Sequence, residues 1–414
     1  MKAAILTIGD ELLIGQVVDT NSAWISEQLN LIGITVKHKI SIGDVDAEII
    51  KGLNIASQDV DFVFITGGLG PTRDDITKST LCHYFNTKLV FNEEVYKDVE
   101  SIFLKRNLPM IDSNRMQAML PESCTVIRNL KGTAPGMWFK KNGVDYFSMP
   151  GVPFEMKAMM TDSILPLIKS KYNLPVILHR TILTHGVGES FLAKKIDSWE
   201  NNLSDNIKLA YLPSPEYVRL RMSIKGEDVV KMTRILDEQE ELLKKIIGKD
   251  IFGSGNQRLP EVVGKILLNA ESTLSTAESC TGGNIARLIT SIPGSSEYFK
   301  GSVVAYSNEV KSNILNVSPL IIKEYGAVSE DVVKQMAIGV RNLLGTDFSI
   351  ATSGVAGPDG GTPEKPVGTV WIAVSGKEKT IAKKFLFAND REINISRSSY
   401  AALDYFRRFM LGYL

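Results

Sequence analysis

The sequence predicts an α/β protein in three parts: a doubly wound, mostly parallel sheet at the N-terminal end, a small α+β module, and a three-layer α/β domain at the C-terminal end. Two observations carry this prediction. Apolar segments alternate with helix-patterned segments over residues 1–171 and again from residue 259, which is typical of β–α–β units. Several apolar segments, such as residues 60–66, are continuous, as expected for strands buried on both faces of a parallel sheet.

Length and composition describe a globular chain with more than one core. The 414 residues are enough for two or three domains, and 44% are hydrophobic. Lys plus Arg and Asp plus Glu both total 47, so no net charge attracts nucleic acid or a membrane. No apolar run reaches the roughly 18 residues of a membrane span, and the first residues are typical of a strand. We expect a cytoplasmic protein; its cysteines suit a reducing compartment and have no zinc-site spacing: Cys82, Cys124 and Cys280.

The N-terminal elements follow one another in the order of a doubly wound sheet. We predict strands and helices in turn at residues 3–8, 19–31, 35–42, 47–57 and 60–66. Right-handed crossovers would bring the loops after Ile8 and Thr66 to the same carboxyl edge of the sheet, where ligands bind.

The regular alternation of predicted strands and helices changes near residue 172. A small α+β module is predicted from a strand after residue 179 and from segments at 189–198, 207–211, 218–224 and 228–247, and residues 253–257 are predicted to be a flexible linker. The third domain then alternates helices and strands at 259–269, 273–277, 285–291, 302–307, 330–344, 347–353, 369–374, 382–388 and up to about 411. We therefore divide the chain into domains 1–171, 172–254 and 255–414.

Residues 275–283, Ser-Thr-Ala-Glu-Ser-Cys-Thr-Gly-Gly, carry the strongest local signal for chemistry. A β-prone segment ends on hydroxyl and thiol side chains, and two glycines then open a helix pattern. A strand, a sharp turn and a helix start place a nucleophile such as Ser279 among unpaired backbone N–H groups. Such donors can hold an anion or stabilise an oxyanion.

A serine at this position would need a base other than histidine. The four histidines, at 38, 83, 179 and 185, all precede this domain. Tyr306 and Lys311 are candidates, because a lysine whose pKa is lowered can activate a serine. The alternative stays open that Tyr306 is a core-edge aromatic residue and Lys311 a solvated helix residue.

A glycine-rich loop at residues 351–363 follows an apolar strand. Its glycines allow the backbone to approach a ligand and offer N–H donors to phosphate. Arg391 and Arg397 add guanidinium groups suited to phosphate. An ordinary long loop and a solvated helix start are the alternatives.

These segments together resemble the C-terminal domain of the competence/damage-inducible protein CinA family, whose matching motifs lie at residues 277–283, 306–311, 326–330 and 353–361. The resemblance implies a nicotinamide-nucleotide amidohydrolase, which converts NMN to nicotinic acid mononucleotide and ammonia without a cofactor. It implies Ser279 as nucleophile, activated by Tyr306 and Lys311. It places the nucleotide at these residues: Thr281, Gly282, Gly283, Asn308, Thr352, Ser353, Gly354, Ala356, Gly357, Arg391 and Arg397.

Two residues affect the expected phosphate contacts and the choice of nucleophile. Ile395 stands where many relatives carry an arginine, which puts phosphate contacts at that position in question. Cys280 is a rival nucleophile, but we expect its side chain to point into the core on the opposite side of the turn.

Three N-terminal loops join glycines to carboxylates, at residues 9–21, 66–77 and 150–156. Glycine-rich turns receive phosphate, and adjacent carboxylates suit divalent cations that bridge it. Capping of a helix by Asp74 and Asp75, and of another by Glu155, is the structural alternative.

These loops resemble the MoaB/Mog-like, molybdopterin-binding domain found at the N-terminus of CinA proteins, over residues 1–171. The resemblance implies either molybdopterin binding or a metal-dependent ADP-ribose pyrophosphatase using Mg²⁺, Mn²⁺ or Co²⁺, with K⁺ as a further candidate. The metal candidates are Asp10, Asp74 and Asp75. The whole candidate site is Asp10, Glu11, Asn21, Asp44, Gly67, Gly68, Gly70, Thr72, Asp74, Asp75 and Glu155.

The middle module resembles the KH-type domain of CinA proteins. A KH fold clamps nucleic acid with a Gly-x-x-Gly loop, whereas residues 186–189 read Gly-Val-Gly-Glu. Residues 179–252 hold 12 basic and 12 acidic residues, which favours a spacer or dimer element over an RNA reader. The expected partners are therefore NMN, ADP-ribose and a second copy of the chain, without nucleic acid or membrane. The competing hypothesis is a molybdopterin-handling or competence-associated interaction protein.

Overall fold

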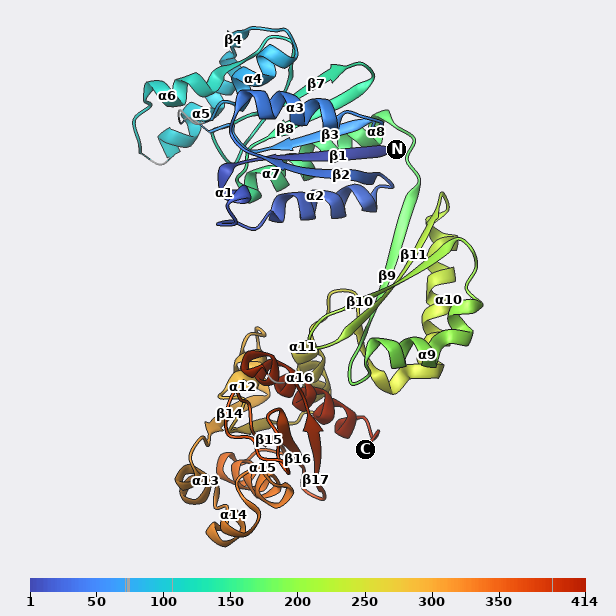
Figure 1. The fold of residues 1–414 in the computed structure, drawn as a ribbon, viewed down its shortest axis with the longest axis vertical. Helices are drawn as coiled ribbons and strands as arrows, with labels where there is room; N and C mark the ends of the chain where they lie inside the picture. The colour runs from blue at the N-terminus through green and yellow to red at the C-terminus, as the bar shows by residue number, and fades with distance from the viewer. Residues whose placement is uncertain (71, 73–74, 106, 389) are drawn as a thin grey trace. The chain divides into compact units, whose positions relative to one another are not determined.

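The chain folds into two compact units in the computed structural model, which describes residues 1–70, 72, 75–105, 107–388 and 390–414. The first unit comprises Met1–Leu178 and Lys225–Val230, and the second comprises His179–Ile224 and Lys231–Leu414. Figure 1 labels the helices and strands of both units.

The first unit contains a six-stranded sheet in the order β2-β1-β3-β8-β7-β6. Its first four strands run parallel: β1 (Lys2–Ile8), β2 (Thr35–Ile42), β3 (Phe62–Thr66) and β8 (Val144–Met149). β7 (Gly136–Lys141) pairs antiparallel with β8, and the edge strand β6 (Thr125–Ile127) pairs antiparallel with β7. Every residue of β3 and β8 is buried, as the continuous apolar sequence of β3 predicts. The predicted mostly parallel sheet is confirmed.

Helices cover both faces of this sheet. Neighbouring residues of β1 point to opposite sides, so that Leu6 joins one hydrophobic cluster with Leu53 of α3, and Ile5 joins another with Leu29 of α2. Figure 1 shows α3 and α2 on opposite sides of β1. The helices of this unit are α1 (Asp10–Leu13), α2 (Thr20–Leu31), α3 (Asp46–Ala56), α4 (Thr77–Tyr84), α5 (Glu93–Lys105), α6 (Asp112–Arg115), α7 (Pro153–Met159) and α8 (Leu165–Lys171). β4 (Leu89–Phe91) and β5 (Met119–Pro121) form a separate two-stranded antiparallel sheet.

The second unit begins with a four-stranded sheet in the order β10-β11-β9-β12. Its elements are β9 (Val176–Thr184), α9 (Glu189–Asn201), β10 (Ile207–Pro213), β11 (Val218–Gly226), α10 (Val229–Ile247) and β12 (Ile251–Ser254). The predicted linker at 253–257 is partly wrong, because Gly253 and Ser254 pair with Leu183 and Ile182 of β9. Backbone pairing there overrides the flexibility that glycine and serine suggest.

The rest of the second unit is built on a five-stranded sheet in the order β14-β13-β15-β16-β17. The three strands β13 (Leu274–Glu278), β14 (Phe299–Val304) and β15 (Phe348–Gly354) are parallel. β16 (Thr369–Ser375) pairs antiparallel with β15, and β17 (Thr380–Leu386) pairs antiparallel with β16. Its helices are α11 (Leu259–Asn269), α12 (Asn284–Thr290), α13 (Asn308–Leu315), α14 (Pro319–Tyr325), α15 (Glu330–Leu344) and α16 (Arg391–Met410).

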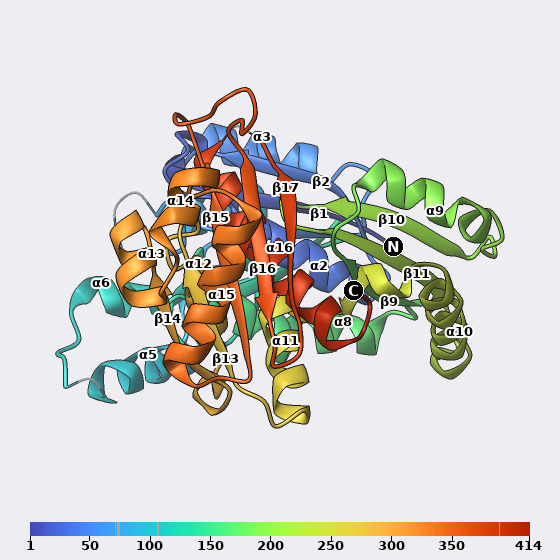
Figure 2. The same cartoon turned by 90° about the horizontal axis from the view of Figure 1, so that it is seen from below.

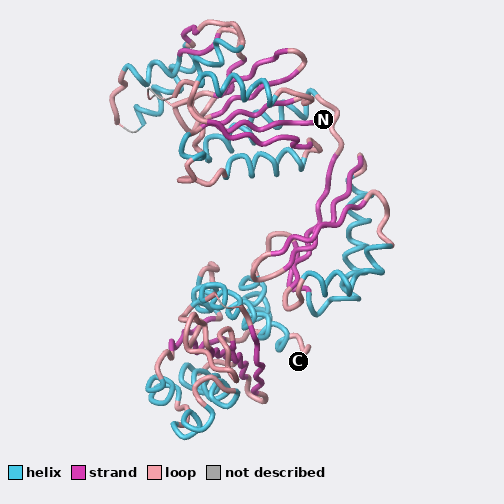
Figure 3. Tube along the Cα trace, in the orientation of Figure 1, coloured by secondary structure: helices cyan, strands magenta, loops and turns pink. Residues whose placement is uncertain are grey.

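This sheet is the middle of three layers, as predicted. On one face, residues such as Ile350 and Ile372 pack with α11, α12 and α16; on the other, Ala351 and Ala373 pack with α15. Figure 2 shows α15 along the strands, and Figure 3 shows the alternation of helix and strand in both units. Over the described residues, none of the helices is long and apolar enough to cross a membrane.

Candidate functional sites

The turn after β13 fixes Ser279 at the carboxyl edge of the C-terminal sheet. The Ser279 N–H donates to the Thr352 carbonyl at 3.0 Å, which continues the pairing of β13 with β15 by one residue. Gly282 and Gly283 have φ values of +60° and +93°, a region that favours glycine, and they let the chain reverse into α12. Ser279 is 8% exposed, so the residue is largely buried.

Lys311 meets Ser279 inside the domain. Its Nζ donates to Ser279 Oγ at 3.2 Å and to the Ala305 and Tyr306 carbonyls at 2.9 and 3.4 Å. The lysine is only 2% exposed, although it lies on the short helix α13, where a solvated position was the alternative. Across the described residues, no carboxylate lies within ion-pair distance of its Nζ.

Burial changes the proton affinity of this lysine. Desolvation lowers the pKa of Lys311 below its ordinary value, and nearby Cys280 and Glu309 oppose this to a smaller extent. The shift favours the neutral amine, which can accept a proton, over the ammonium ion, which cannot. Lys311 therefore has the position and the electrostatic setting of a general base.

Tyr306 lies differently from the sequence prediction. The strand before it ends at Val304, and its side chain is 61% exposed. Its hydroxyl accepts a hydrogen bond from Arg391 Nη2 at 2.9 Å. The structure thus joins the Tyr306 hydroxyl to the candidate nucleotide residues, and only its backbone carbonyl contacts Lys311.

The glycine-rich loop is held by the first turn of α16. Arg391 Nη1 donates to the Gly357 carbonyl at 2.7 Å, and Asn394 Nδ2 donates to the Ala356 carbonyl at 2.9 Å. Thr352, before this loop, contacts the turn that follows β13: its Oγ1 lies 2.7 Å from Thr281 Oγ1. Asn394 is 1% exposed and was missed by the sequence analysis. Its spacing of three residues from Arg391, on the same face of a helix, was the available signal.

Glu278 is a second residue that sequence reasoning missed. Its carboxylate is fully buried and accepts hydrogen bonds from the backbone N–H groups of the first turn of α12: Gly283 at 3.0 Å, Ile285 at 3.0 Å and Ala286 at 2.8 Å. These are the donors expected to hold a substrate anion. That expectation is wrong for these three groups. Among the described atoms, the N–H groups of Cys280 and Thr281 have no such partner.

Cys280 belongs to the core. The residue is 7% exposed and packs in the hydrophobic cluster that contains Leu274 and Ile285. Burial raises the pKa of the Cys280 thiol to about 12. The thiol therefore stays protonated near neutral pH, and a protonated thiol is a weak nucleophile.

The remaining candidates of this site lie at its border. Asn308 and Gly282 are exposed at the start of α13 and in the turn before α12. Ser353 Oγ donates to the Ala327 carbonyl at 2.7 Å. Arg397 Nε donates to the Pro215 carbonyl of the β10–β11 turn at 2.8 Å, and Ile395 packs against the core. Arg397 is therefore tied to the middle domain, away from the contacts that Arg391 makes.

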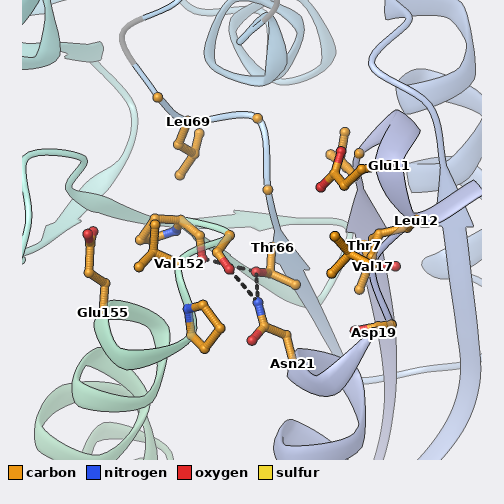
Figure 4. Close-up of a pocket in the computed structure, with 18 of the residues that line it drawn as sticks. Thr7, Glu11, Leu12, Val17, Asp19, Asn21, Thr66, Leu69, Val152 and Glu155 are labelled. Atoms are coloured by element: carbon orange, nitrogen blue, oxygen red, sulfur yellow. Dashed lines mark hydrogen bonds between the residues drawn. The ribbon is translucent and has the colours of Figure 1, made fainter. Parts of the chain in front are cut away.

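The first unit has a pocket of about 430 Å³ at the carboxyl edge of its sheet (Figure 4). The loops that follow β1, β3 and β8 meet there, as the predicted crossovers require. Glu11 lies on one side of the pocket in Figure 4 and Glu155 on the other. The candidate residues that line it are Glu11, Asn21, Asp44, Gly67, Gly68, Gly70, Asp75 and Glu155.

Carboxylates gather on one side of this pocket. Asp10 and Asp44 are linked reciprocally, because the backbone N–H of each donates to the other's carboxylate at 3.3 Å. Burial raises the pKa of Asp44, and the negative charges of Asp10, Glu11 and Asp75 add to the rise. Asp75 accepts a hydrogen bond from the Thr72 N–H at 3.0 Å.

Asp74, a metal candidate, lies outside the described residues. Over the residues that are described, no group of three or more His, Cys, Asp or Glu side chains is arranged to hold a metal ion. The metal assignment thus stays a prediction. Thr77 is a further residue of interest, since its fully buried Oγ1 has no hydrogen-bond partner among the described atoms and adjoins Gly68.

Two amides organise the rest of the pocket. Asn21 Nδ2 donates to the Gly151 carbonyl at 2.7 Å and to Thr66 Oγ1 at 3.3 Å. Asn129 Nδ2 donates to Glu155 Oε2 at 2.7 Å and fastens the following loop to α7. Glu155 therefore has a structural contact in addition to its place in the pocket.

In the middle domain, the residue before the Gly186–Glu189 turn contacts α16 of the same unit. Arg408 Nη2 donates to the His185 carbonyl at 2.8 Å, and His185 Nδ1 lies 3.1 Å from Asp404 Oδ2. Within the turn itself, Gly186, Gly188 and Glu189 are exposed.

Three family models match consecutive parts of the chain. They are described as a probable molybdopterin binding domain over residues 4–170, a damage-inducible protein CinA KH domain over residues 179–253 and a CinA C-terminal domain over residues 256–410.

Relatives match over the full length. A CinA-like protein of Cytophaga hutchinsonii is 46% identical over 406 residues, which covers 98% of this chain and 97% of the relative. A putative competence-damage inducible protein of Caldicellulosiruptor saccharolyticus is 39% identical over 413 residues, with 100% of each chain covered. The crystal structure of a competence damage-inducible protein A from Klebsiella pneumoniae matches 38% of this chain and 97% of its own, with 35% identity and a TM-score of 0.37. From the identity and coverage of its relatives, this chain belongs to the CinA family.

Proposed function

We propose that the C-terminal domain is a nicotinamide-nucleotide amidohydrolase that converts NMN to nicotinic acid mononucleotide and ammonia. The observation that carries the proposal is the buried contact of 3.2 Å between Lys311 Nζ and Ser279 Oγ. A serine hydroxyl beside a desolvated amine has both parts of a Ser–Lys nucleophile. The family resemblance supplies the substrate.

The reaction would proceed in two halves. The neutral Lys311 amine accepts the proton of Ser279 Oγ as that oxygen attacks the carboxamide carbon, and the carbonyl oxygen becomes an oxyanion. The N–H groups of Cys280 and Thr281 would donate to it. The C–N bond then breaks, ammonia leaves with the proton from Lys311, and an ester to Ser279 remains. Water, deprotonated by the same amine, cleaves the ester, releases the carboxylic acid and restores the serine.

The nucleotide would lie against the loop that Arg391 supports. Arg391 donates to Gly357 and Tyr306 through its two terminal nitrogens, which fixes its guanidinium plane beside the loop. A guanidinium group held in this way suits a phosphate oxygen. We therefore assign Tyr306 to nucleotide binding through Arg391, and the activation of Ser279 to Lys311.

An ammonia assay on the full chain with NMN tests the proposal. The wild type should release ammonia in proportion to the enzyme added, and Ser279→Ala should release none. Ser291→Ala is a matched control, since that hydroxyl is at the end of α12 and donates only to the Leu288 carbonyl of its own helix, at 2.7 Å. A wild type without ammonia release, or a fully active Ser279→Ala, would reject the assignment.

We propose a second activity for the first unit, the metal-dependent hydrolysis of a pyrophosphate such as ADP-ribose. Its support is the pocket that joins the loop of Gly67, Gly68 and Gly70 to the carboxylates of Asp44 and Asp75. When bound, a divalent cation would neutralise the pyrophosphate and polarise its phosphorus–oxygen bonds. Asp10, Asp44 and Asp75 have the oxygen donors that such a cation prefers.

The competing function for this pocket is the binding of a molybdopterin-related ligand without turnover. ADP-ribose hydrolysis that is abolished by EDTA and by Asp75→Asn would favour the pyrophosphatase. Tight binding of a pterin without hydrolysis of ADP-ribose would favour the binding protein.

A further inference from the structure

The last helix, α16, belongs to two sites at once. Its first turn carries Arg391 and Asn394, which hold the loop of the proposed nucleotide site. The same helix contacts the middle domain along its remaining length. From Arg391 to Arg397 the helix rises by about 9 Å, at ~1.5 Å per residue, so that the two sets of contacts are less than two turns apart.

The nearer contacts are with the turn between β10 and β11, residues 214–217. Ser396 Oγ donates to Glu216 Oε1 at 2.7 Å, and Arg397 Nε donates to the Pro215 carbonyl at 2.8 Å. One turn further along, the rings of Tyr400 and Tyr217 stack with their centroids 6.1 Å apart. This turn of the middle domain therefore contacts α16 through the Glu216 carboxylate, the Pro215 carbonyl and the Tyr217 ring.

The same stretch of α16 also contacts α12, the helix that follows Ser279. Asn284, the first residue of α12, donates from its Nδ2 to Ser399 Oγ at 2.9 Å. Residues 396–400 of α16 are thus held between the middle domain and the helix that follows Ser279. A displacement of the 214–217 turn would therefore move this part of α16, and with it the contact to α12.

The far end of α16 is anchored by buried charges. Arg407 donates to the Lys249 and Ile251 carbonyls at 2.8 and 3.0 Å, and its carboxylate partner is Asp404 at 2.7 Å. Arg407 and Asp404 are 2% and 3% exposed. Between this anchored end and the first turn, Glu216 and Pro215 contact Ser396 and Arg397, and Ile395 packs in the core of the domain.

We propose that the 214–217 turn is a positioning element for the nucleotide site: through Glu216 and Ser396 it holds α16 so that Arg391 and Asn394 support the loop of Ala356 and Gly357. Glu216 touches neither the substrate nor Ser279 in this role. This inference rests on the proposed amidohydrolase for its kinetic consequence, but its structural consequence can be measured without it.

The kinetic experiment uses Glu216→Ala, Ser396→Ala and the double variant in the full chain. Each single variant should raise the KM for NMN by about 3- to 10-fold and leave kcat within about twofold, because a weakened support of the loop lowers binding and not the serine chemistry. The double variant should be no worse than either single variant, since both remove the same bond. Glu216→Gln keeps an oxygen that can accept from Ser396 and should restore the wild-type KM.

Glu200→Ala is the matched control within the same domain. It removes a hydrogen bond of 2.5 Å from the Tyr211 hydroxyl to a carboxylate of the middle domain that has no contact with α16 among the described residues. Its KM should equal that of the wild type. Unchanged KM in both Glu216→Ala and Ser396→Ala would overturn the inference, as would a fall in kcat in parallel with the thermal midpoint.

Hydrogen exchange separates this inference from the proposed function. The amides of residues 354–357 should exchange faster in Glu216→Ala than in the wild type and in Glu200→Ala, whether or not the wild type releases ammonia. Identical exchange in that segment in all three proteins overturns the positioning role. Absent ammonia release in the wild type rejects the amidohydrolase alone.

Discussion

Replacing Lys311 with methionine tests the proposed chemistry most directly. Methionine keeps an unbranched side chain of similar length and fits a buried site, but it removes the Nζ that lies 3.2 Å from Ser279 Oγ. A positioned general base contributes about 10²- to 10⁴-fold to the rate, which is ~3–5 kcal/mol of activation free energy. We expect kcat to fall by that factor, with the KM for NMN within about threefold of the wild type.

The assay is continuous detection of ammonia over a range of pH. The neutral amine is the active form, so the wild-type rate should rise with pH up to the pKa of Lys311, which burial places below its ordinary 10.5. Any residual rate of Lys311→Met should not show this rise with pH. A variant that keeps more than a tenth of the wild-type kcat, with the same pH profile, would refute the role of Lys311 as base.

Stability gives an independent check with a definite sign. Because the pKa of Lys311 is lowered in the folded state, the unfolded chain binds more protons between that value and 10.5. The free energy of unfolding of the wild type should therefore rise relative to that of Lys311→Met as the pH increases through this window. Urea denaturation of both proteins at several pH values measures the difference, and a difference that falls with pH would contradict the buried, easily deprotonated amine.

Three further variants have defined outcomes. Cys280→Ala should keep kcat within about threefold of the wild type. The wild type should resist inactivation by iodoacetamide, because the Cys280 thiol has a pKa of about 12 in the core; complete inactivation by alkylation would contradict this. Glu278→Gln should lower the free energy of unfolding by about 2–3 kcal/mol in a urea titration, since an amide NH₂ would face backbone N–H groups; an unchanged midpoint would argue against the buried cap. Tyr306→Phe should raise the KM for NMN more than it lowers kcat, since its hydroxyl meets Arg391; a loss of kcat as large as that of Lys311→Met would return Tyr306 to the activation of Ser279.

The sequence was sufficient for the parts of the fold that local patterns determine. The continuous apolar segment at residues 60–66 predicted a buried strand, and β3 occupies Phe62–Thr66. The helix predicted at 259–269 is α11, because its apolar residues repeat at helical spacing. The polar Gly-Ser sequence at 253–254 misled the prediction, because its pairing partner in β9 lies about 70 residues earlier and no local pattern reveals it.

The site was predictable in its outline but not in its hydrogen bonds. Strand, turn and helix placed Ser279 correctly at the carboxyl edge, and the absence of a later histidine directed attention to Lys311. Glu278 belongs to the same motif, yet alternation along a strand does not reveal whether a carboxylate accepts hydrogen bonds from the next helix. The direction of the Tyr306 hydroxyl likewise depends on Arg391, which lies 85 residues away.

The pairing of β13 with β15 has a consequence for how such a domain can change. Glu278 is opposite Thr352 in the register, so backbone bonds alone place the nucleophile beside the loop that would receive the nucleotide. A single deletion within β13 would shift Ser279 by about 3.3 Å and turn it to the other face of the sheet. Insertions at residues 358–366, beyond the paired strands, leave that alignment intact. Length variation should thus accumulate in the loop and be absent from the two strands, even where their amino acids diverge.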